Sequence, residues 1–109
     1  MYYNEDKILS LLGLASRARK LQTGDSLLKA IRQKKVELVL ISNDASDNTK
    51  KKFEDKCTYY HIPYYMFSSS EALSKAIGKS NRVCVGVCDK GFAIKIKSML
   101  GGWYYGKKE

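Results

Sequence analysis

The sequence is poor in several residue types that would each point to a particular class of protein. It has one histidine and three cysteines, an odd number, and no apolar segment as long as a membrane span. Its first residues, "MYYNEDK", do not have the basic start and apolar run of a secretory signal. We therefore expect a cytoplasmic protein with reduced thiols rather than a disulfide framework.

The patterns that hold a nucleotide cofactor or form a catalytic pair are also missing. The sequence contains no Walker-type phosphate loop and no Gly-x-Gly-x-x-Gly after an apolar strand. His61 would need a cysteine or a carboxylate beside it for acid–base or nucleophilic chemistry, and its position next to Ile62 and Pro63 is more typical of a strand edge. We expect a protein without enzymatic activity and without a cofactor.

The cysteines are poor candidates for a metal site. Cys84 and Cys88 lie on one expected strand, on the same face but roughly 13 Å apart at about 3.3 Å per residue, which is too far for one zinc ion. With Cys57 they fall inside apolar patterns, where free cysteine is usually a core residue. We expect no bound metal.

Acidic residues are few compared with basic ones. The 109 residues include 11 Asp and Glu against 20 Lys and Arg, a formal net charge of +9 that attracts polyanions. Nucleic acid is therefore the first partner to consider. The basic residues occur in short groups, which favours a folded binding face over a basic arm. These groups are Arg17, Arg19 and Lys20; Arg32, Lys34 and Lys35; Lys50, Lys51 and Lys52; and Lys107 and Lys108.

Short apolar segments indicate the strands of a small sheet. Residues 36–42, "VELVLIS", are almost continuously apolar and rich in Val, Leu and Ile, as expected for a central strand that is covered on both faces. Further strands are expected near Leu21, in "HIPYYMF" and over 82–88, "RVCVGVC".

Five segments between and beside these strands have helical periodicity, and residues that commonly cap helices precede them. The expected caps are Asn4 or Asp6, Thr23 or Asp25, Ser46 or Asp47, Ser68 in a capping box with Glu71, and Asp89. Gly78 would end the fourth helix, and Gly101 and Gly102 the fifth. The expected inward positions include Ile8, Leu11, Leu12 and Ala15; Leu27, Leu28 and Ile31; Phe53, Cys57 and Tyr60; and Phe92, Ile96 and Met99.

This alternation predicts an α/β fold, a three-layer α/β/α sandwich around a small four-stranded mixed sheet. We expect a single domain over residues 1–102 and a C-terminal tail at 103–109. Asp44 and Asp47 follow the central strand, where α/β folds often bind ligands, but they more commonly cap the next helix.

The start of the second helix is the strongest candidate site. Its free amides and dipole favour an anion, Gly24 allows close approach of another backbone, and Lys29 and Arg32 add positive charge further along. Such a start suits a phosphate backbone or a polar base edge. The alternative is an ordinary capped surface helix with solvated lysines.

Six strings of the sequence, in order, resemble segments of the ribosomal protein L7Ae family, whose members bind kink-turn RNA. They are "KILSLLGLASRARKL", "KAIRQKKVELVLISNDAS", "NTKKKFEDKC", "IPYY", "LSKAIGK" and "RVCVGVCDKGFA". The resemblance runs from about Lys7 to Leu100 and is greatest to small bacterial members. It implies an RNA-binding protein, ribosomal or regulatory in its target, that recognises a bent RNA element by shape, and we expect a monomer.

The resemblance also implies which residues contact RNA. In the family, the start of the second helix meets the tandem sheared G·A pairs through Gly, Asn, Glu and Lys. Aligning on Lys29 places Thr23, Asp25 and Ser26 at the first three positions, and only the lysine matches. The Asp25 carboxylate accepts hydrogen bonds but cannot donate as an amide does. This difference predicts RNA binding that is weaker or differently selective. It also favours the alternative, a protein-interaction or general ribosome-association module.

A second contact region is implied in the loop before the last strand, where family members cover an extruded nucleotide with apolar residues. Here that loop is "GKSNRVC". Arg82 would stack on a base or pair with phosphate, and Val83 and Cys84 would supply apolar contact. The expected RNA-binding residues are Thr23, Gly24, Asp25, Ser26, Lys29, Arg32, Arg82, Val83 and Cys84.

Overall fold

The computed structural model describes residues 5–100. In chain order the elements are α1 (Glu5–Arg17), β1 (Leu21–Gln22), α2 (Gly24–Arg32), β2 (Leu38–Ile41), α3 (Asp47–Tyr59), β3 (Tyr64–Met66), α4 (Ser70–Ile77), β4 (Cys84–Val87) and α5 (Lys90–Met99). The alternative cap at Asn4, the stop at Gly101 and Gly102, and the tail at 103–109 fall outside the described residues.

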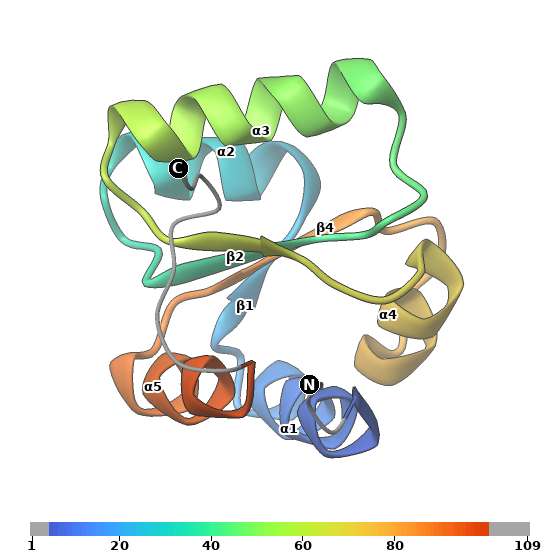
Figure 1. Cartoon of the computed structure of the whole chain (residues 1–109). Coiled ribbons are helices and arrows are strands. Elements are labelled where there is room, and N and C mark those ends of the chain that lie inside the picture. Colours follow the sequence, from blue (N-terminus) through green and yellow to red (C-terminus); the bar gives the residue numbers. More distant parts are fainter. Residues whose placement is uncertain (1–4, 101–109) are drawn as a thin grey trace.

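The four strands form one mixed sheet with the order β1-β4-β2-β3. β4 pairs antiparallel with both β1 and β2, whereas β2 and β3 are parallel. Helices α2 and α3 cover one face of the sheet, and α1, α4 and α5 cover the other (Figure 1). The predicted three-layer sandwich with a four-stranded mixed sheet is confirmed.

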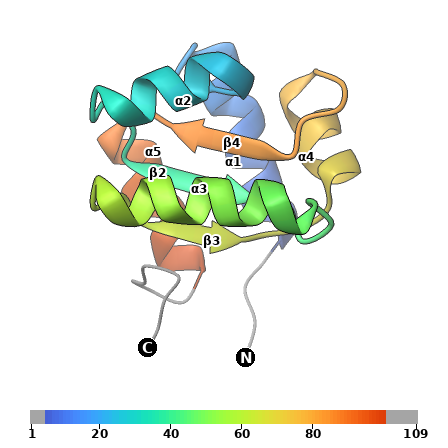
Figure 2. The same ribbon diagram turned by 90° about the horizontal axis from the view of Figure 1, so that it is seen from above.

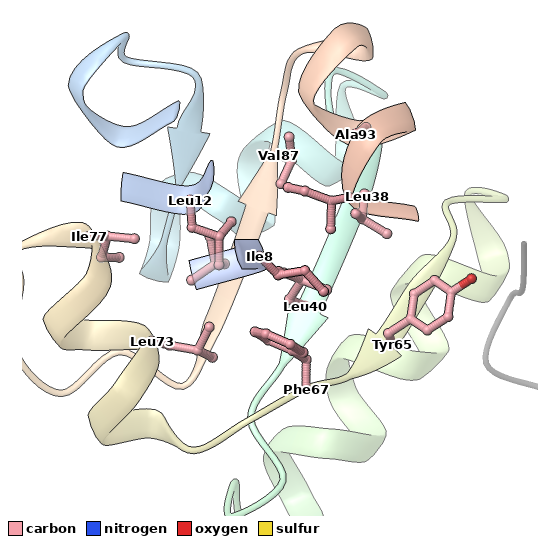
Figure 3. Close-up of a cluster of buried hydrophobic side chains, with 12 residues drawn as sticks. Ile8, Leu12, Leu38, Leu40, Tyr65, Phe67, Leu73, Ile77, Val87 and Ala93 are labelled. Carbon is pink, nitrogen blue, oxygen red and sulfur yellow. The ribbon is translucent and has the colours of Figure 1, made fainter. Parts of the chain in front are cut away.

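β2 is an interior strand with both faces buried, as its continuous apolar pattern predicts. Leu38 and Leu40 point into the core beneath α1, α4 and α5, and Val39 and Ile41 point into the core beneath α2 and α3. Figure 3 shows the first core, where Phe67 and Ile8 lie close to Leu40. Most of the predicted inward helix residues are buried in these two clusters, but Leu11, Leu28, Tyr60, Phe92 and Met99 are only partly buried at their edges.

The cap of α4 differs from the sequence prediction. α4 is capped by Ser69, whose hydroxyl accepts a hydrogen bond from the Ala72 amide at 3.1 Å, so the predicted capping box at Ser68 is wrong. Ser68 instead has a positive φ of 60° and donates to the Glu5 carboxylate at 2.7 Å. Its hydroxyl thereby ties the start of α1 to the end of β3.

Asp44 does not cap α3, the next helix in the chain. Ser46 caps α3, and Asp44 accepts hydrogen bonds from the amide and the hydroxyl of Ser70, both at 3.0 Å, at the start of α4. The parallel pairing of β2 and β3 explains this, because the segments that follow parallel strands leave the sheet at the same edge.

Gly86 in β4 allows α2 to pack close to the sheet. A Cβ atom at this position would collide with the Cδ1 of Leu27 and would lie 3.3 Å from the Cγ1 of Val36. Leu27 is fully buried, so its side chain has little room to move aside. The absence of a side chain at Gly86 therefore sets the position of the first turn of α2.

Candidate nucleic-acid interface

The pairing of β1 with β4 brings the two predicted contact regions together. Leu21 pairs with Val87 and Gln22 with Gly86 in an antiparallel register. Because the strands run in opposite directions, the residues after β1 lie beside the residues before β4. The start of α2 and the loop between α4 and β4 consequently lie at the same end of the molecule (Figure 2).

A pocket of about 560 Å³ lies between these segments. Three of the predicted residues line it: Thr23 and Ser26 from the start of α2, and Arg82 from the loop. The remaining lining residues lie outside the predicted RNA-binding set and are Ser16, Arg19, Leu21, Gln22, Ile77 and Lys79. Hydroxyl and cationic groups thus surround a hollow at the positive end of a helix.

The first turn of α2 has no side-chain cap. Thr23 is the N-cap residue, with an extended backbone, but its side chain accepts no hydrogen bond from the helix, and the predicted capping by Thr23 or Asp25 is wrong. The Ser26 hydroxyl instead donates to the Thr23 carbonyl at 2.8 Å. By contrast, α3, α4 and α5 are capped by Ser46, Ser69 and Asp89. The start of α2 therefore keeps amide donors for an external acceptor.

Gly24 has a left-handed backbone, with φ at +61°, which favours glycine. A Cβ atom there would meet nothing within 4 Å, so this glycine is explained by its backbone conformation rather than by crowding. Asp25, Lys29 and Arg32 are exposed and follow one face of α2 at spacings of four and three. They lie beside the pocket on the same helix rather than among its lining residues.

The loop that carries Arg82 is held by a buried serine. The Ser74 hydroxyl accepts a hydrogen bond from the Arg82 amide at 2.8 Å and donates to the Arg82 carbonyl at 3.3 Å. The turn before it contains two left-handed residues, Gly78 and Asn81. The Nε atom of Arg82 is buried and has no hydrogen-bond partner among the described residues. The loop backbone is therefore fixed, while the guanidinium keeps donor capacity beside the pocket.

The cations around the pocket are not neutralised by neighbouring carboxylates. Across residues 5–100, an ion pair joins Lys51 to Asp55 at 3.7 Å, and none involves Arg19, Lys79 or Arg82. Unpaired cations around a helix N-terminus give this hollow a positive potential. An anion with several oxygen acceptors, such as a phosphate group, fits such a site.

Val83 and Cys84 differ in how much surface they offer. Val83 is half-buried and packs against the core beneath α2 and α3, whereas Cys84 is only 3% exposed within that core. Burial raises the pKa of the Cys84 thiol to about 12, and burial likewise raises the pKa of Cys57 to about 12. Both thiols therefore stay protonated at neutral pH and are poor nucleophiles.

Arg19 and Lys79 are the pocket cations that the sequence pattern does not identify. Arg19 belongs to a basic group and Lys79 to the predicted loop, but nothing local indicates that they face each other. Arg19 lies in the turn after α1 with a φ of +61°, and Lys79 follows the glycine that ends α4. Only the packing of α1 beside α4 places both at the pocket.

Between residues 5 and 100 there is no group of three or more His, Cys, Asp or Glu side chains that could hold a metal ion. In the same range no helix is long and apolar enough to cross a membrane.

Comparisons with known proteins identify the family and relatives of this chain. Residues 6–97 match the model of the ribosomal protein L7Ae/L30e/S12e/Gadd45 family. The chain is 52% identical over 91 residues to the RNA-binding protein YlxQ of Bacillus subtilis (strain 168), an alignment that covers 83% of this chain and 91% of that protein. It is 45% identical over 100 residues to RNA-binding protein YlxQ of Enterococcus faecium, covering 91% and 96%.

Solved structures show the same architecture. A Bacillus halodurans protein of unknown function superposes with a TM-score of 0.82 at 48% identity, covering 85% of this chain and 95% of that one. The Giardia lamblia 15.5kD RNA binding protein superposes with a TM-score of 0.75 at 22% identity over 92% of each chain, which is a likeness of fold. With the family model matched over nearly all of the described residues, the chain belongs to the ribosomal protein L7Ae/L30e/S12e/Gadd45 family.

Proposed function

We propose that this protein is a non-enzymatic RNA-binding protein that recognises kink-turn-like structured RNA through the pocket between the start of α2 and the α4–β4 loop. One observation carries the proposal: Thr23, Ser26 and Arg82, which the sequence places in two distant segments, line a single pocket with unpaired cations. The YlxQ relatives, both named RNA-binding proteins, support it.

The uncapped start of α2 has a defined role in this proposal. Its amides and the Ser26 hydroxyl face a base edge or a phosphate oxygen in the bent duplex. Arg19, Lys79 and Arg82 neutralise backbone phosphates around the pocket, and Arg82 and Val83 flank a projecting nucleotide. Cys84 shapes this surface from beneath because its own side chain is buried.

We further propose that the protein acts as a cytoplasmic monomer in association with ribosomal RNA. The excess of basic residues and the unpaired cations at one end of the molecule support a polyanionic partner of this kind. The domain responsible is the whole α/β unit within residues 1–102, because the pocket draws on α1, α2, α4 and the segment before β4.

The decisive experiment compares two RNA duplexes. The protein is titrated, at near-physiological salt, into a fluorophore-labelled kink-turn and into the same duplex with its G·A pairs replaced by Watson–Crick pairs. A clear preference for the kink-turn supports the proposal. Equal and salt-sensitive binding to both leaves only general polyanion affinity and refutes structure-specific recognition.

Two substitutions distinguish contacts to the RNA backbone from contacts that recognise the kink-turn. Lys29→Ala should weaken binding to both RNAs by about fivefold to tenfold, because an exposed phosphate contact carries no sequence information. Ser26→Ala should instead reduce the preference for the kink-turn. Lys51→Ala, at an exposed residue of α3 that is already ion-paired, is the matched control and should change neither quantity. If Lys29→Ala and Ser26→Ala both bind like the parent protein, the site lies elsewhere.

The second candidate function is a protein-interaction or general ribosome-association module without kink-turn specificity. Asp25 favours it, because an exposed carboxylate at the first turn of α2 repels phosphate and cannot donate to a base. In the titration this function predicts no difference between the two duplexes. Asp25→Asn then discriminates further, since restored selectivity in that variant would show that the carboxylate had suppressed it.

A further inference from the structure

A groove of about 610 Å³ runs between α1 and α4, outside the pocket described above. Its inner surface is formed by small residues, Gly13 on α1 and Ala72 and Ala76 on α4. The two helices approach so closely that a Cβ atom on Gly13 would lie 3.1 Å from the Ala76 carbonyl oxygen. The Ser16 hydroxyl also donates to the Ile77 carbonyl at 3.1 Å. These contacts hold α1 and α4 close together, so the groove is shallow and its floor is fixed.

The sides of this groove are apolar and accessible. Leu14 is 48% exposed and Leu9 is half-buried beside it on the same helix. Within residues 5–100 the other large exposed apolar side chains are Tyr59 and Ile94, on α3 and α5, and neither lines this groove. An apolar side chain seated between Leu14 and the alanines would remove apolar surface from water on both sides.

The charged residues of the groove have one sign. Arg17 and Lys75 line it, both are exposed, and neither forms an ion pair with any described residue. No carboxylate is among the lining residues. An occupant that complements both features has apolar side chains on one face and carboxylates positioned for the two cations. A nucleic acid supplies the negative charge but not the apolar side chains.

We propose that the α1–α4 groove docks an acidic amphipathic helix of a protein partner. Apolar anchors at positions i, i+3 and i+4 of that helix fill the groove over Gly13 and Ala76, and its carboxylates pair with Arg17 and Lys75. This inference does not depend on RNA binding, because the groove and the pocket have no lining residue in common.

The test is a selection that does not presuppose the partner. A phage-displayed library of random peptides of helical length is selected in parallel on the full-length protein, on Leu14→Glu and on Ile94→Glu. The expected result is enrichment of acidic peptides with apolar residues at helical spacing, which is abolished on Leu14→Glu and kept on Ile94→Glu. Both substitutions replace an exposed apolar residue by the same acid, so Ile94→Glu controls for the added charge.

A charge reversal gives a readout that damage to the fold would not produce. In Arg17→Glu/Lys75→Glu, the same selection should enrich basic amphipathic peptides in place of acidic ones, while thermal unfolding stays close to that of the parent. Selected peptides should shift the amide resonances of α1 and α4 in NMR spectra and leave those of Thr23 and Ser26 unchanged.

Three outcomes would overturn the proposal: no enrichment on the parent protein, enrichment that survives Leu14→Glu, or peptide shifts confined to the pocket residues. Shifts of the groove amides by kink-turn RNA, with no peptide enriched, would assign the groove to RNA. Concentration-dependent self-association that Leu14→Glu abolishes would assign it to a second copy of the chain. Absence of a kink-turn preference in the RNA titration would leave this inference standing.

Discussion

Ser74 is a buried side chain that fixes the loop carrying Arg82, one of the two proposed RNA-contact segments. Its hydroxyl satisfies both the amide and the carbonyl of Arg82, and it lies among the buried residues of α4. Arg82 needs such support because the preceding residue, Asn81, has a left-handed backbone with a φ of 54°. We regard Ser74 as a positioning residue for the proposed RNA contact.

Ser74→Ala should therefore lower the free energy of unfolding by about 1–3 kcal/mol, because it leaves two backbone groups of Arg82 without partners. It should also weaken kink-turn binding under conditions where the protein remains folded. Chemical denaturation and the RNA titration measure the two effects. Ser98→Ala removes an exposed hydroxyl whose partner is the Lys95 carbonyl and should change neither. Full affinity in folded Ser74→Ala would exclude the positioning role.

The position of helix α2 on the sheet depends on Gly86 in β4. Gly86→Ala should lower the free energy of unfolding by about 1–3 kcal/mol, since the added methyl group overlaps the buried Leu27 side chain. It should also reduce RNA affinity although Gly86 does not line the pocket, because α2 must shift. Denaturation and titration check both expectations.

A second substitution separates this cause from a general decrease in stability. Leu27→Val shortens the side chain that the new methyl group meets, so the double variant Gly86→Ala/Leu27→Val should be less destabilised than the sum of the two single variants predicts. It should also regain part of the RNA affinity. Additive effects would mean that Gly86 acts through something other than its contact with Leu27.

Most helices and strands can be predicted from periodicity, because the spacing of apolar residues shows which faces of an element are buried. The continuous apolar segment at β2 and the cap at Ser46 are examples, and both are confirmed. The choice among Ser68, Ser69 and Ser70 as the cap of α4 is different. It depends on Glu5 and Asp44, which take the hydroxyls of Ser68 and Ser70 and are distant in sequence. A local sequence pattern cannot predict hydrogen-bond partners that are distant in the sequence.

The sequence predicts which two segments form the candidate site, but it does not predict all the residues that line it. The start of α2 and the loop before β4 come from sequence and resemblance, and the structure places both at one pocket. Arg19 and Lys79 join them only through the packing of α1 with α4, which no spacing of residues reveals. Cys84, singled out as an apolar contact, is buried because both faces of β4 are covered.

For the molecule as a whole, the number of cations that bind phosphate determines how steeply RNA affinity falls with salt. Removing one cation that binds a phosphate should reduce the slope of log affinity against log salt by about 0.9, or about 0.7 where the RNA is single-stranded. We predict such a change for Arg19→Ala and for Lys79→Ala, whose cations line the pocket without an ion pair. Lys51→Ala, whose ammonium already pairs with Asp55, should leave the slope unchanged. Equal slopes in the parent and all three variants would show that Arg19 and Lys79 do not contact RNA phosphates.

The antiparallel pairing of β1 with β4 also has a consequence during synthesis. Strand β1 and the start of α2 are synthesised early, but β4, which pairs with β1, and Arg82, which lies across the pocket, come more than half the chain later. A nascent chain of which only the part up to α2 has left the ribosome therefore lacks the residues on the other side of the pocket. The proposed RNA pocket can therefore be complete only after β4 has emerged and paired between β1 and β2.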